Sequence, residues 1–227
     1  MTITYHPEMI QGSEEWVKIR QGLMTASEMK FVLTPTLKIA DNDNTRSHVY
    51  ELAAQRITDY TEPTYLGDEM LRGTVDEPIA RQLYHDNFSP VTECGFITND
   101  DHGFTVGYSP DGLVGDDGLI EVKGRRGKFT VQSIVDGEVP KEHMLQIQTG
   151  LLVTGRKWCD YLSFTGGMPL LPIRVYPDEA AHEAIIKACT AFETKIATVM
   201  NAYHERLLNA KWVMAERLIE ADGEIVL

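Results

Sequence analysis

One segment of the sequence has the residue types and spacing of a centre that cleaves phosphodiesters. Ser109-Pro110-Asp111-Gly112 is followed, ten residues after Asp111, by Glu121-Val122-Lys123. Cleavage requires a more acidic water, a clamp on the charge that builds on the phosphoryl oxygens, and help for the departing alkoxide. Mg²⁺ held by hard oxygen ligands supplies most of this. The spacing therefore predicts two carboxylates and an ammonium group on adjacent strand ends.

Each of these residues has an expected role. Asp111 lies between a proline and a glycine, so a sharp turn presents its carboxylate at the end of a strand. Glu121 and Lys123 are two apart on a strand and share one face, whereas Val122 points into the core. We expect Asp111, Glu121 and the Val122 backbone carbonyl to bind Mg²⁺. We expect Lys123 to orient or deprotonate the attacking water, after desolvation and the metal's charge lower its pKa.

A simpler interpretation is that Asp111 only caps a turn and that Glu121 and Lys123 form an exposed cross-strand pair. The Pro-Asp-Gly turn and the apolar Leu119-Ile120 before Glu121 favour the catalytic interpretation.

The net charge of −13 argues against a protein that coats nucleic acid over a broad surface, because such binding needs many Lys and Arg contacts to phosphate. A local basic channel is still compatible with an acidic exterior. Cations gather in two places, at Lys18 and Arg20 and at Arg125, Arg126 and Lys128, although the second group alone reads as a solvated loop.

The length of 227 residues fits one domain, and we expect a single unit over residues 1–227 with a helical extension from about 177. No apolar run is long enough to cross a membrane, and the first residues lack the pattern of a secretion signal. Cys94, Cys159 and Cys189 fit buried thiols in a reducing cytoplasm and neither a disulfide framework nor a zinc site. We therefore expect a cytoplasmic protein.

The first third of the chain reads as helical. Ser13 starts a helix that runs to about Gly22, and Thr25-Ala26-Ser27-Glu28 has the spacing of a capping box that opens a second one. After a loop at Asp41 to Asn44, helical spacing returns in Arg46 to Tyr60 and in Asp68 to Asp86. Gly73 and Pro78 are irregularities in the last of these helices.

The middle of the chain changes to strands, and the end returns to helices. The strands expected as a meander are Val91 to Thr98, Phe104 to Ser109 and Leu119 to Lys123. Helices over Phe129 to Val135 and Lys141 to Val153 precede strands over Lys157 to Phe164 and Leu170 to Tyr176. Pro177 then opens a long helix to about Leu218.

Pro110-Asp111 and Glu121-Val122-Lys123 resemble the core signature of the PD-(D/E)XK nuclease superfamily. Further motifs follow in the order seen in lambda-exonuclease-like (YqaJ-type) phage recombination nucleases, so the resemblance spans roughly residues 11 to 165. These motifs are Trp16 to Glu28, Gly73 to Glu77, Ser109 to Gly112, and Gln146-Ile147-Gln148.

The resemblance implies an α/β fold with a restriction-endonuclease-like core, in which a central mixed β-sheet is flanked by helices, with N-terminal helices and a C-terminal helix. It implies an alkaline exonuclease that depends on Mg²⁺, with Mn²⁺ as a substitute ion. Such an enzyme digests one strand of duplex DNA from its 5′ end and leaves a 3′ overhang for a single-strand annealing protein. A ring-shaped homotrimer is also implied, and such a ring could concentrate cations in its channel while its outside stays anionic.

Site residues are implied position by position. Glu77, Asp111 and Glu121 would be metal ligands, Lys123 the water-activating lysine, and Gln146 a helix residue that supports them. Glu77 on its own reads as a solvated helix residue. Gln146 and Gln148 diverge on a helix, and Gln146 is the one expected to face the site.

Arg20 and Ser27, with Ser109, match residues that hold the 5′ phosphate. Arg20 also offers a planar fork for phosphate, and the amides around Thr25 to Ser27 form a natural anion site. The alternatives are a salt bridge from Arg20 to Glu15 or Glu28, and capping alone at Thr25.

Other residues near these motifs have simpler or less settled interpretations. Arg125 and Arg126 are candidate DNA-binding residues where the run Gly124 to Gly127 departs from the family pattern. Trp16 is interpreted as a core residue. His143 lies one helical turn before Gln146, so we expect that its side chain can reach the active-site groove.

Two other functions remain open from the sequence. One is an endonuclease of the same fold, which would cut a covalently closed circle. The other is a DNA-end-binding scaffold without catalysis, whose signature would be missing ligands, but Asp111, Glu121 and Lys123 are all present.

Overall fold

The computed structural model describes residues 2–63 and 68–217. Its elements, in chain order, are β1 (Ile3–His6), α1 (Glu14–Arg20), β2 (Met24–Thr25), the 3₁₀ helix η1 (Ala26–Phe31), α2 (Asp43–Thr58), α3 (Asp68–Asn87), β3 (Val91–Thr92), β4 (Phe96–Asn99), β5 (Val106–Tyr108), β6 (Gly112–Val114), β7 (Gly118–Gly124), α4 (Gly127–Asp136), α5 (Lys141–Thr154), β8 (Trp158–Phe164), β9 (Ile173–Val175) and α6 (Glu179–Leu208).

The strands form two sheets, with the orders β1-β4-β5-β2 and β3-β6-β7-β8-β9. In the second sheet β7 and β8 are parallel along their whole length, from Gly118 opposite Trp158 to Gly124 opposite Phe164. A parallel pair needs a crossover connection, which α4 and α5 provide. The expected α/β fold with mixed sheets and flanking helices is confirmed.

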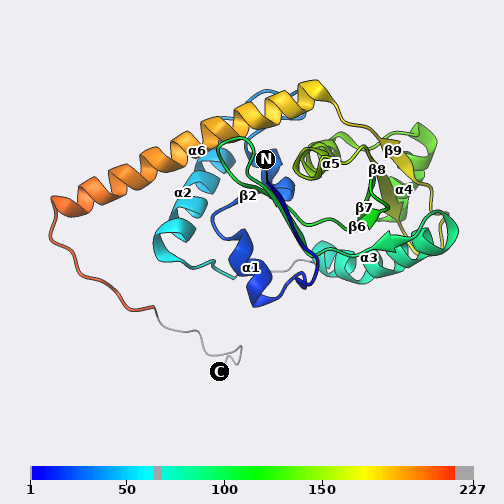
Figure 1. The fold of residues 1–227 in the computed structure, drawn as a ribbon, viewed down its shortest axis with the longest axis horizontal. Coiled ribbons are helices and arrows are strands. Elements are labelled where there is room, and N and C mark those ends of the chain that lie inside the picture. The colour runs from blue at the N-terminus through cyan, green and yellow to red at the C-terminus, as the bar shows by residue number, and fades with distance from the viewer. Residues whose placement is uncertain (1, 64–67, 218–227) are drawn as a thin grey trace.

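Strand β7 separates two buried clusters, because its successive side chains point to opposite faces. Leu119 belongs to the cluster that includes α5, whereas Ile120 and Val122 belong to the cluster that includes Ala80 and Tyr84 of α3. Figure 1 shows α5 and α3 on opposite sides of this sheet. The side chains of Glu121 and Lys123 therefore leave β7 on the α5 side.

Helix α6 lies across α2 and then projects beyond the body of the molecule (Figure 1). Ala188, Phe192 and Ile196 are buried, but residues 201–206 are all exposed. Helices gain most of their stability from packing one face against a core. The helix begins after its N-cap Asp178 and ends at Leu208, earlier than the expected Leu218; residues 218–227 lie outside those described.

The expected strand from Val91 to Thr98 is wrong, because β3 and β4 belong to different sheets. Gly95 separates them, and its backbone lies so close to Met9 that an added Cβ would stand 1.8 Å from the Met9 carbonyl oxygen. The simple meander is also wrong, since the unpredicted β6 intervenes between β5 and β7. β1 and β2 were not predicted either, because β1 has almost no buried side chain and β2 has two residues.

Several local predictions are confirmed at the helix ends. The Ser13 side chain caps α1 by accepting from the Trp16 N–H, and the Thr25–Glu28 capping box is present, although it opens a 3₁₀ helix. α2 begins within the expected loop, with Asn42 as its N-cap. α3 continues through Gly73 and Pro78 without a break.

The three cysteines, Cys94, Cys159 and Cys189, are buried and form no disulfide.

Candidate active site

The motif residues meet where the turn before β6 lies beside β7. Asp111 is almost fully buried, and its Oδ2 accepts a hydrogen bond of 2.6 Å from the Val122 N–H. The β6–β7 ladder ends at Gly112 opposite Ile120, so Val122 lies just beyond it. The N–H and C=O of one strand residue point to the same side. The Val122 carbonyl therefore lies on the edge of β7 that faces Asp111.

Glu121 is fully buried at the centre of this arrangement. Its Oε1 accepts from Lys123 Nζ at 2.6 Å, and its Oε2 accepts from the Tyr108 hydroxyl at 3.0 Å. An exposed cross-strand pair would leave both charges in water, so that alternative is wrong for Glu121 and Lys123. Tyr108 was not predicted as a site residue, although it lies one position before Ser109.

Glu77 reaches the site from α3. Its carboxylate accepts from Arg81 Nη1 at 3.0 Å, and the same Nη1 donates to the Asp111 carbonyl oxygen at 2.8 Å. Glu77 is half-buried, so the interpretation as a fully solvated helix residue is wrong. Arg81 was missed, although its position four residues after Glu77 was the available signal.

The electrostatics reflect three carboxylates in one partly buried cluster. Burial, and then the charges of Glu121 and Glu77, raises the pKa of Asp111 well above its usual value. Burial also raises the pKa of Glu77, against the opposing charge of Arg81. Like charges held this close in a low dielectric favour a cation among them.

The expected fall in the pKa of Lys123 is not found. Burial acts in that direction, but the carboxylates of Glu121 and Asp111 outweigh it and raise the pKa above its usual value. In this arrangement Lys123 is a protonated partner of Glu121. Its ammonium group balances part of the negative charge of these carboxylates.

The donor set fits a hard cation by its chemistry, because carboxylate and backbone carbonyl oxygens are the ligands that Mg²⁺ takes in proteins. Within residues 2–63 and 68–217, no three acidic, histidine or cysteine side chains stand as a preformed metal cluster. Two of the candidate carboxylates are paired with cations in this arrangement, Glu121 with Lys123 and Glu77 with Arg81. We therefore read the carboxylates as candidate ligands that are balanced by Lys123 and Arg81.

A second cluster adjoins the carboxylates through Ser109. Its Oγ accepts from Trp16 Nε1 at 3.0 Å and from Arg20 Nη1 at 3.2 Å. Arg20 Nη2 also lies 3.5 Å from Thr25 Oγ1, and its guanidinium carbon lies 4.0 Å from the Trp16 ring centre. Ser109 is two residues before Asp111, so this cluster lies beside the metal-ligand candidates.

The alternatives for this cluster are resolved in part. In the described part of the chain Arg20 forms no salt bridge, although Glu28 lies near enough to oppose the fall in its pKa that burial causes. Glu28 accepts instead from the Thr25 N–H and Thr25 Oγ1, so Thr25 does cap η1. Ser27 Oγ lies 3.3 Å from Thr25 Oγ1 and its side chain is exposed.

Trp16 is not a core residue, contrary to the interpretation from sequence. It is half-buried, and α1 has no buried residue at all. Its indole covers Arg20 and bonds Ser109, which makes it part of the candidate phosphate site. Helical spacing alone could not separate a core tryptophan from one that supports an arginine at the surface.

The two glutamines of α5 differ in their surroundings. Gln148 is buried and links α5 to the start of α6, donating to the Tyr176 carbonyl oxygen and accepting from the Asp178 N–H. Gln146 is half-buried and makes no hydrogen bond among the described residues. Gln146 therefore remains the better candidate to support the site.

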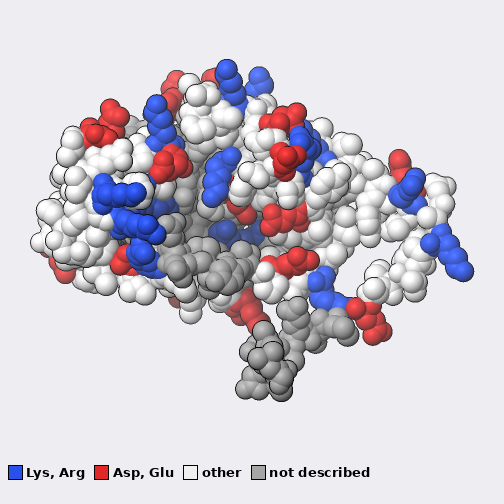
Figure 2. Space-filling model, turned by 180° about the vertical axis from the view of Figure 1, so that it is seen from behind, with Lys and Arg blue, Asp and Glu red and all other residues white. Residues whose placement is uncertain are grey.

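Arg125 and Arg126 lie beyond Lys123, between β7 and α4. Arg125 is held by Glu142 at 2.8 Å, whereas Arg126 is exposed at the N-cap of α4. The Arg125 guanidinium and the Lys128 ammonium both lie over the Phe129 ring. Figure 2 shows Lys and Arg side chains gathered at one end of the molecule, on an otherwise mixed surface.

His143 stacks on Tyr161 with ring centres 5.6 Å apart. Burial, followed by the charges of Lys123, Arg125 and Lys30, lowers the pKa of His143 to about 3. The residue therefore lies close to the Lys123 side of the site as an uncharged ring.

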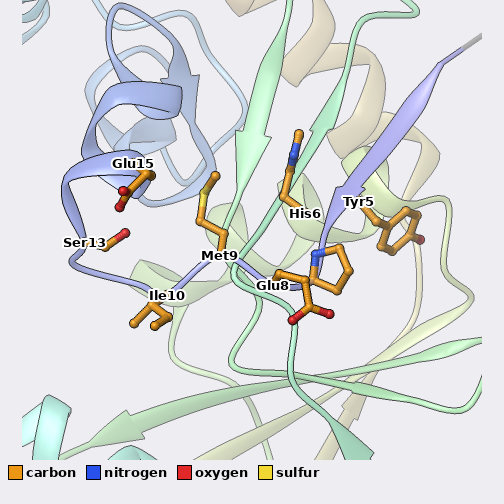
Figure 3. A pocket seen from close by; sticks show the side chains of 8 residues that line it. Tyr5, His6, Glu8, Met9, Ile10, Ser13 and Glu15 are labelled. Atoms are coloured by element: carbon orange, nitrogen blue, oxygen red, sulfur yellow. The ribbon is translucent and has the colours of Figure 1, made fainter.

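A hollow of about 510 Å³ lies around the segment between β1 and α1, and none of Glu77, Asp111 and Glu121 lines it (Figure 3). Its lining is Tyr5, His6, Pro7, Glu8, Met9, Ile10, Ser13 and Glu15. The motif residues predicted to hold a metal ion or a phosphate therefore lie outside this hollow.

Residues 15–157 match the model of the YqaJ-like viral recombinase domain. The chain belongs to this family. The resemblance drawn from the motifs is thereby confirmed. The comparison with curated protein sequences returned no match.

Two solved structures of one protein are similar to this chain. The alkaline exonuclease LHK-Exo from Laribacter hongkongensis is 31% identical, with a TM-score of 0.77, and the match covers 87% of this chain and 99% of that chain. Its complex with dAMP gives 32% identity with the same coverage and TM-score. A phage-related exonuclease from Haemophilus somnus 129PT shares the fold, with 12% identity, a TM-score of 0.56, and coverage of 80% of this chain and 96% of that chain.

Within the described residues, no helix is both long and apolar enough to cross a membrane.

Proposed function

We propose that this protein is a Mg²⁺-dependent exonuclease that digests one strand of duplex DNA from its 5′ end and leaves a 3′ overhang. The coarse class, a DNA exonuclease, follows from the family and from the match to an alkaline exonuclease. The metal, the polarity and the overhang are the proposal. Mn²⁺ is expected to substitute for Mg²⁺.

One observation carries the polarity. The Arg20, Trp16 and Ser109 cluster lies two residues from Asp111, so a terminal phosphate held by Arg20 would place the next phosphodiester near the carboxylates. Arginine presents a planar fork of donors that matches phosphate geometry. Thr25 and Ser27 add hydroxyls beside it. This arrangement supports the capture of a 5′-phosphorylated end.

Each candidate site residue has a distinct role in the proposed reaction. Glu77, Asp111, Glu121 and the Val122 carbonyl would hold Mg²⁺, which when bound makes water more acidic and neutralises charge on the phosphoryl oxygens. Lys123 would orient or deprotonate the attacking water, and Gln146 would support the site from α5. Arg125 and Arg126 would contact the DNA backbone beyond Lys123.

The likeness to LHK-Exo supports the product expected. That protein has been solved with dAMP, a mononucleotide, and stepwise digestion releases mononucleotides. A single-strand annealing protein would then take up the overhang.

We also propose one nuclease domain over residues 1–227 with a helical extension from about 177, assembled as a ring-shaped homotrimer in the cytoplasm of the host cell. Such a ring would allow a chain of net charge −13 to concentrate its cations in the channel.

The test is digestion of linear duplex DNA labelled at either the 5′ or the 3′ end, beside a covalently closed circle, with Mg²⁺ and with EDTA. We expect early release of 5′-labelled mononucleotides, an intact circle and no reaction in EDTA. Early release of the 3′ label would overturn the polarity. Cutting of the circle would favour an endonuclease, and no cleavage of any DNA would favour a scaffold.

A further inference from the structure

Arg81 joins two of the candidate metal ligands that come from different parts of the chain. Its Nη1 donates to Glu77 Oε1 on α3 at 3.0 Å and to the backbone carbonyl oxygen of Asp111 at 2.8 Å. Its Nη2 lies 3.4 Å from Glu93 Oε2. The Arg81 side chain is 16% exposed, so its contacts with Glu77 and Asp111 are largely shielded from water.

We propose that Arg81 is a positioning residue that holds Glu77 and the Asp111 turn in a fixed relative orientation, so that both carboxylates can bind the same cation. This inference rests on the proposed function, because it assigns a role within the same metal site. Arg81 touches neither substrate nor metal in this role, and it acts through the two ligands.

The geometry leaves oxygens on both ligands for a cation. Arg81 takes Oε1 of Glu77, and among the described residues no hydrogen bond reaches Oε2. In Asp111 the Val122 N–H takes Oδ2, while Arg81 holds the backbone carbonyl and not the carboxylate. The Asp111 turn is therefore fixed from α3 and from β7 together. Loss of Arg81 would remove the contact between α3 and Asp111 and free the Glu77 side chain to rotate.

A lysine at position 81 could not hold Glu77 and the Asp111 carbonyl oxygen in the same way. A guanidinium has several donors in a rigid plane and can serve two acceptors at fixed angles, whereas an ammonium is a flexible point charge. Outer groups that orient metal ligands typically contribute about 10- to 100-fold in metal affinity or activity. We therefore expect an effect of that size when the guanidinium is removed.

The experiment measures Mn²⁺ binding by the full-length protein without DNA, from the electron paramagnetic resonance signal of free Mn²⁺. The variants are Arg81→Gln, Arg81→Lys, Glu77→Gln and the control Glu93→Gln. The Glu93 side chain is 74% exposed, so its loss removes one Arg81 contact and neither ligand contact. Thermal unfolding of each variant establishes that it is folded at the assay temperature.

We expect Arg81→Gln to weaken Mn²⁺ binding about 10- to 100-fold. Arg81→Lys should fall between that variant and the unchanged protein, and Glu93→Gln should match the unchanged protein. In DNA digestion, Arg81→Gln should raise the half-saturating Mg²⁺ concentration more than it lowers the maximal rate. Arg81→Lys keeps the charge near Glu77, so it serves if the glutamine variant does not fold.

The outcomes separate the two proposals. If the unchanged protein binds Mn²⁺ and Glu77→Gln weakens binding, but the folded Arg81 variants bind as tightly as the unchanged protein, the role of Arg81 is overturned and the metal site stands. If the unchanged protein does not bind Mn²⁺, or Glu77→Gln has no effect, the metal site itself fails and the role of Arg81 fails with it.

Discussion

The ring of Tyr108 lies directly against the backbone of Gly150, so that a Cβ added to this glycine would stand 2.7 Å from the Tyr108 Cζ. The hydroxyl on that Cζ donates to Glu121, the buried carboxylate of the candidate site. A glycine in α5 thus determines where a tyrosine of β5 holds a glutamate of β7.

Gly150→Ala should therefore displace Tyr108 and lower both stability and activity. Alanine in a helix is normally better than glycine by about 1 kcal/mol, but overpacking a core costs roughly 1–3 kcal/mol. We expect net destabilisation, measured by urea unfolding, and slower DNA digestion. Gly73→Ala on α3 is the control, because its Cβ would meet nothing within 4 Å. Stabilisation by both substitutions would contradict the close packing.

Lys123→Ala should reduce cleavage by about 10²- to 10⁴-fold, the range of general acid–base effects. DNA-end binding should persist, because the Arg20 cluster is separate from Lys123. The measurements are digestion rates in Mg²⁺ and fluorescence anisotropy of end binding in Ca²⁺. Equal losses of binding and of cleavage would count against a role in water activation.

Arg20→Ala should weaken the preference for 5′-phosphorylated ends over 5′-hydroxyl ends, because Arg20 supplies the charged fork of the candidate phosphate site. Ser109→Ala should have a smaller effect, since it removes a neutral hydroxyl. Rates on the two kinds of end check both variants. If the unchanged protein and Arg20→Ala each digest the two ends equally, the phosphate assignment is wrong.

His143→Phe should make the protein less sensitive to mild acid. Burial and nearby cations lower the pKa of His143 to about 3, from an ordinary value of 6.5. Between these values the unfolded chain binds a proton that the folded chain does not, so stability falls as pH falls. From pH 7.5 to 5.5 this residue should lower the free energy of unfolding by about 1 kcal/mol.

Phenylalanine keeps the stacking on Tyr161 and removes the titration. The loss of stability between the two pH values, measured by urea unfolding, should therefore be smaller in His143→Phe than in the unchanged protein. An equal loss in both proteins would place the pKa of His143 near its ordinary value.

Much of the candidate site could be predicted from the sequence, because local rules determine it. The two-residue period of a strand places Glu121 and Lys123 on one face, and the Pro-Asp-Gly turn places Asp111 at a strand end. Capping rules identified Ser13 and Thr25 as helix starts. These features depend on neighbours within a few residues, so the order of residues is enough to specify them.

Other features were decided only by the tertiary structure, because they join residues that are far apart in sequence. Trp16 reaches Ser109, and Arg81 reaches Asp111, across segments whose approach no local pattern encodes. The strand expected from Val91 to Thr98 was wrong for the same reason. It divides at Gly95 because the distant backbone of Met9 packs there, and no local pattern encodes that contact. The sequence alone thus determined which residues could do the chemistry and which face of β7 carries them. Packing decided which neighbours hold them in place, and the charge balance within the site raises the pKa of Lys123 when desolvation alone would lower it.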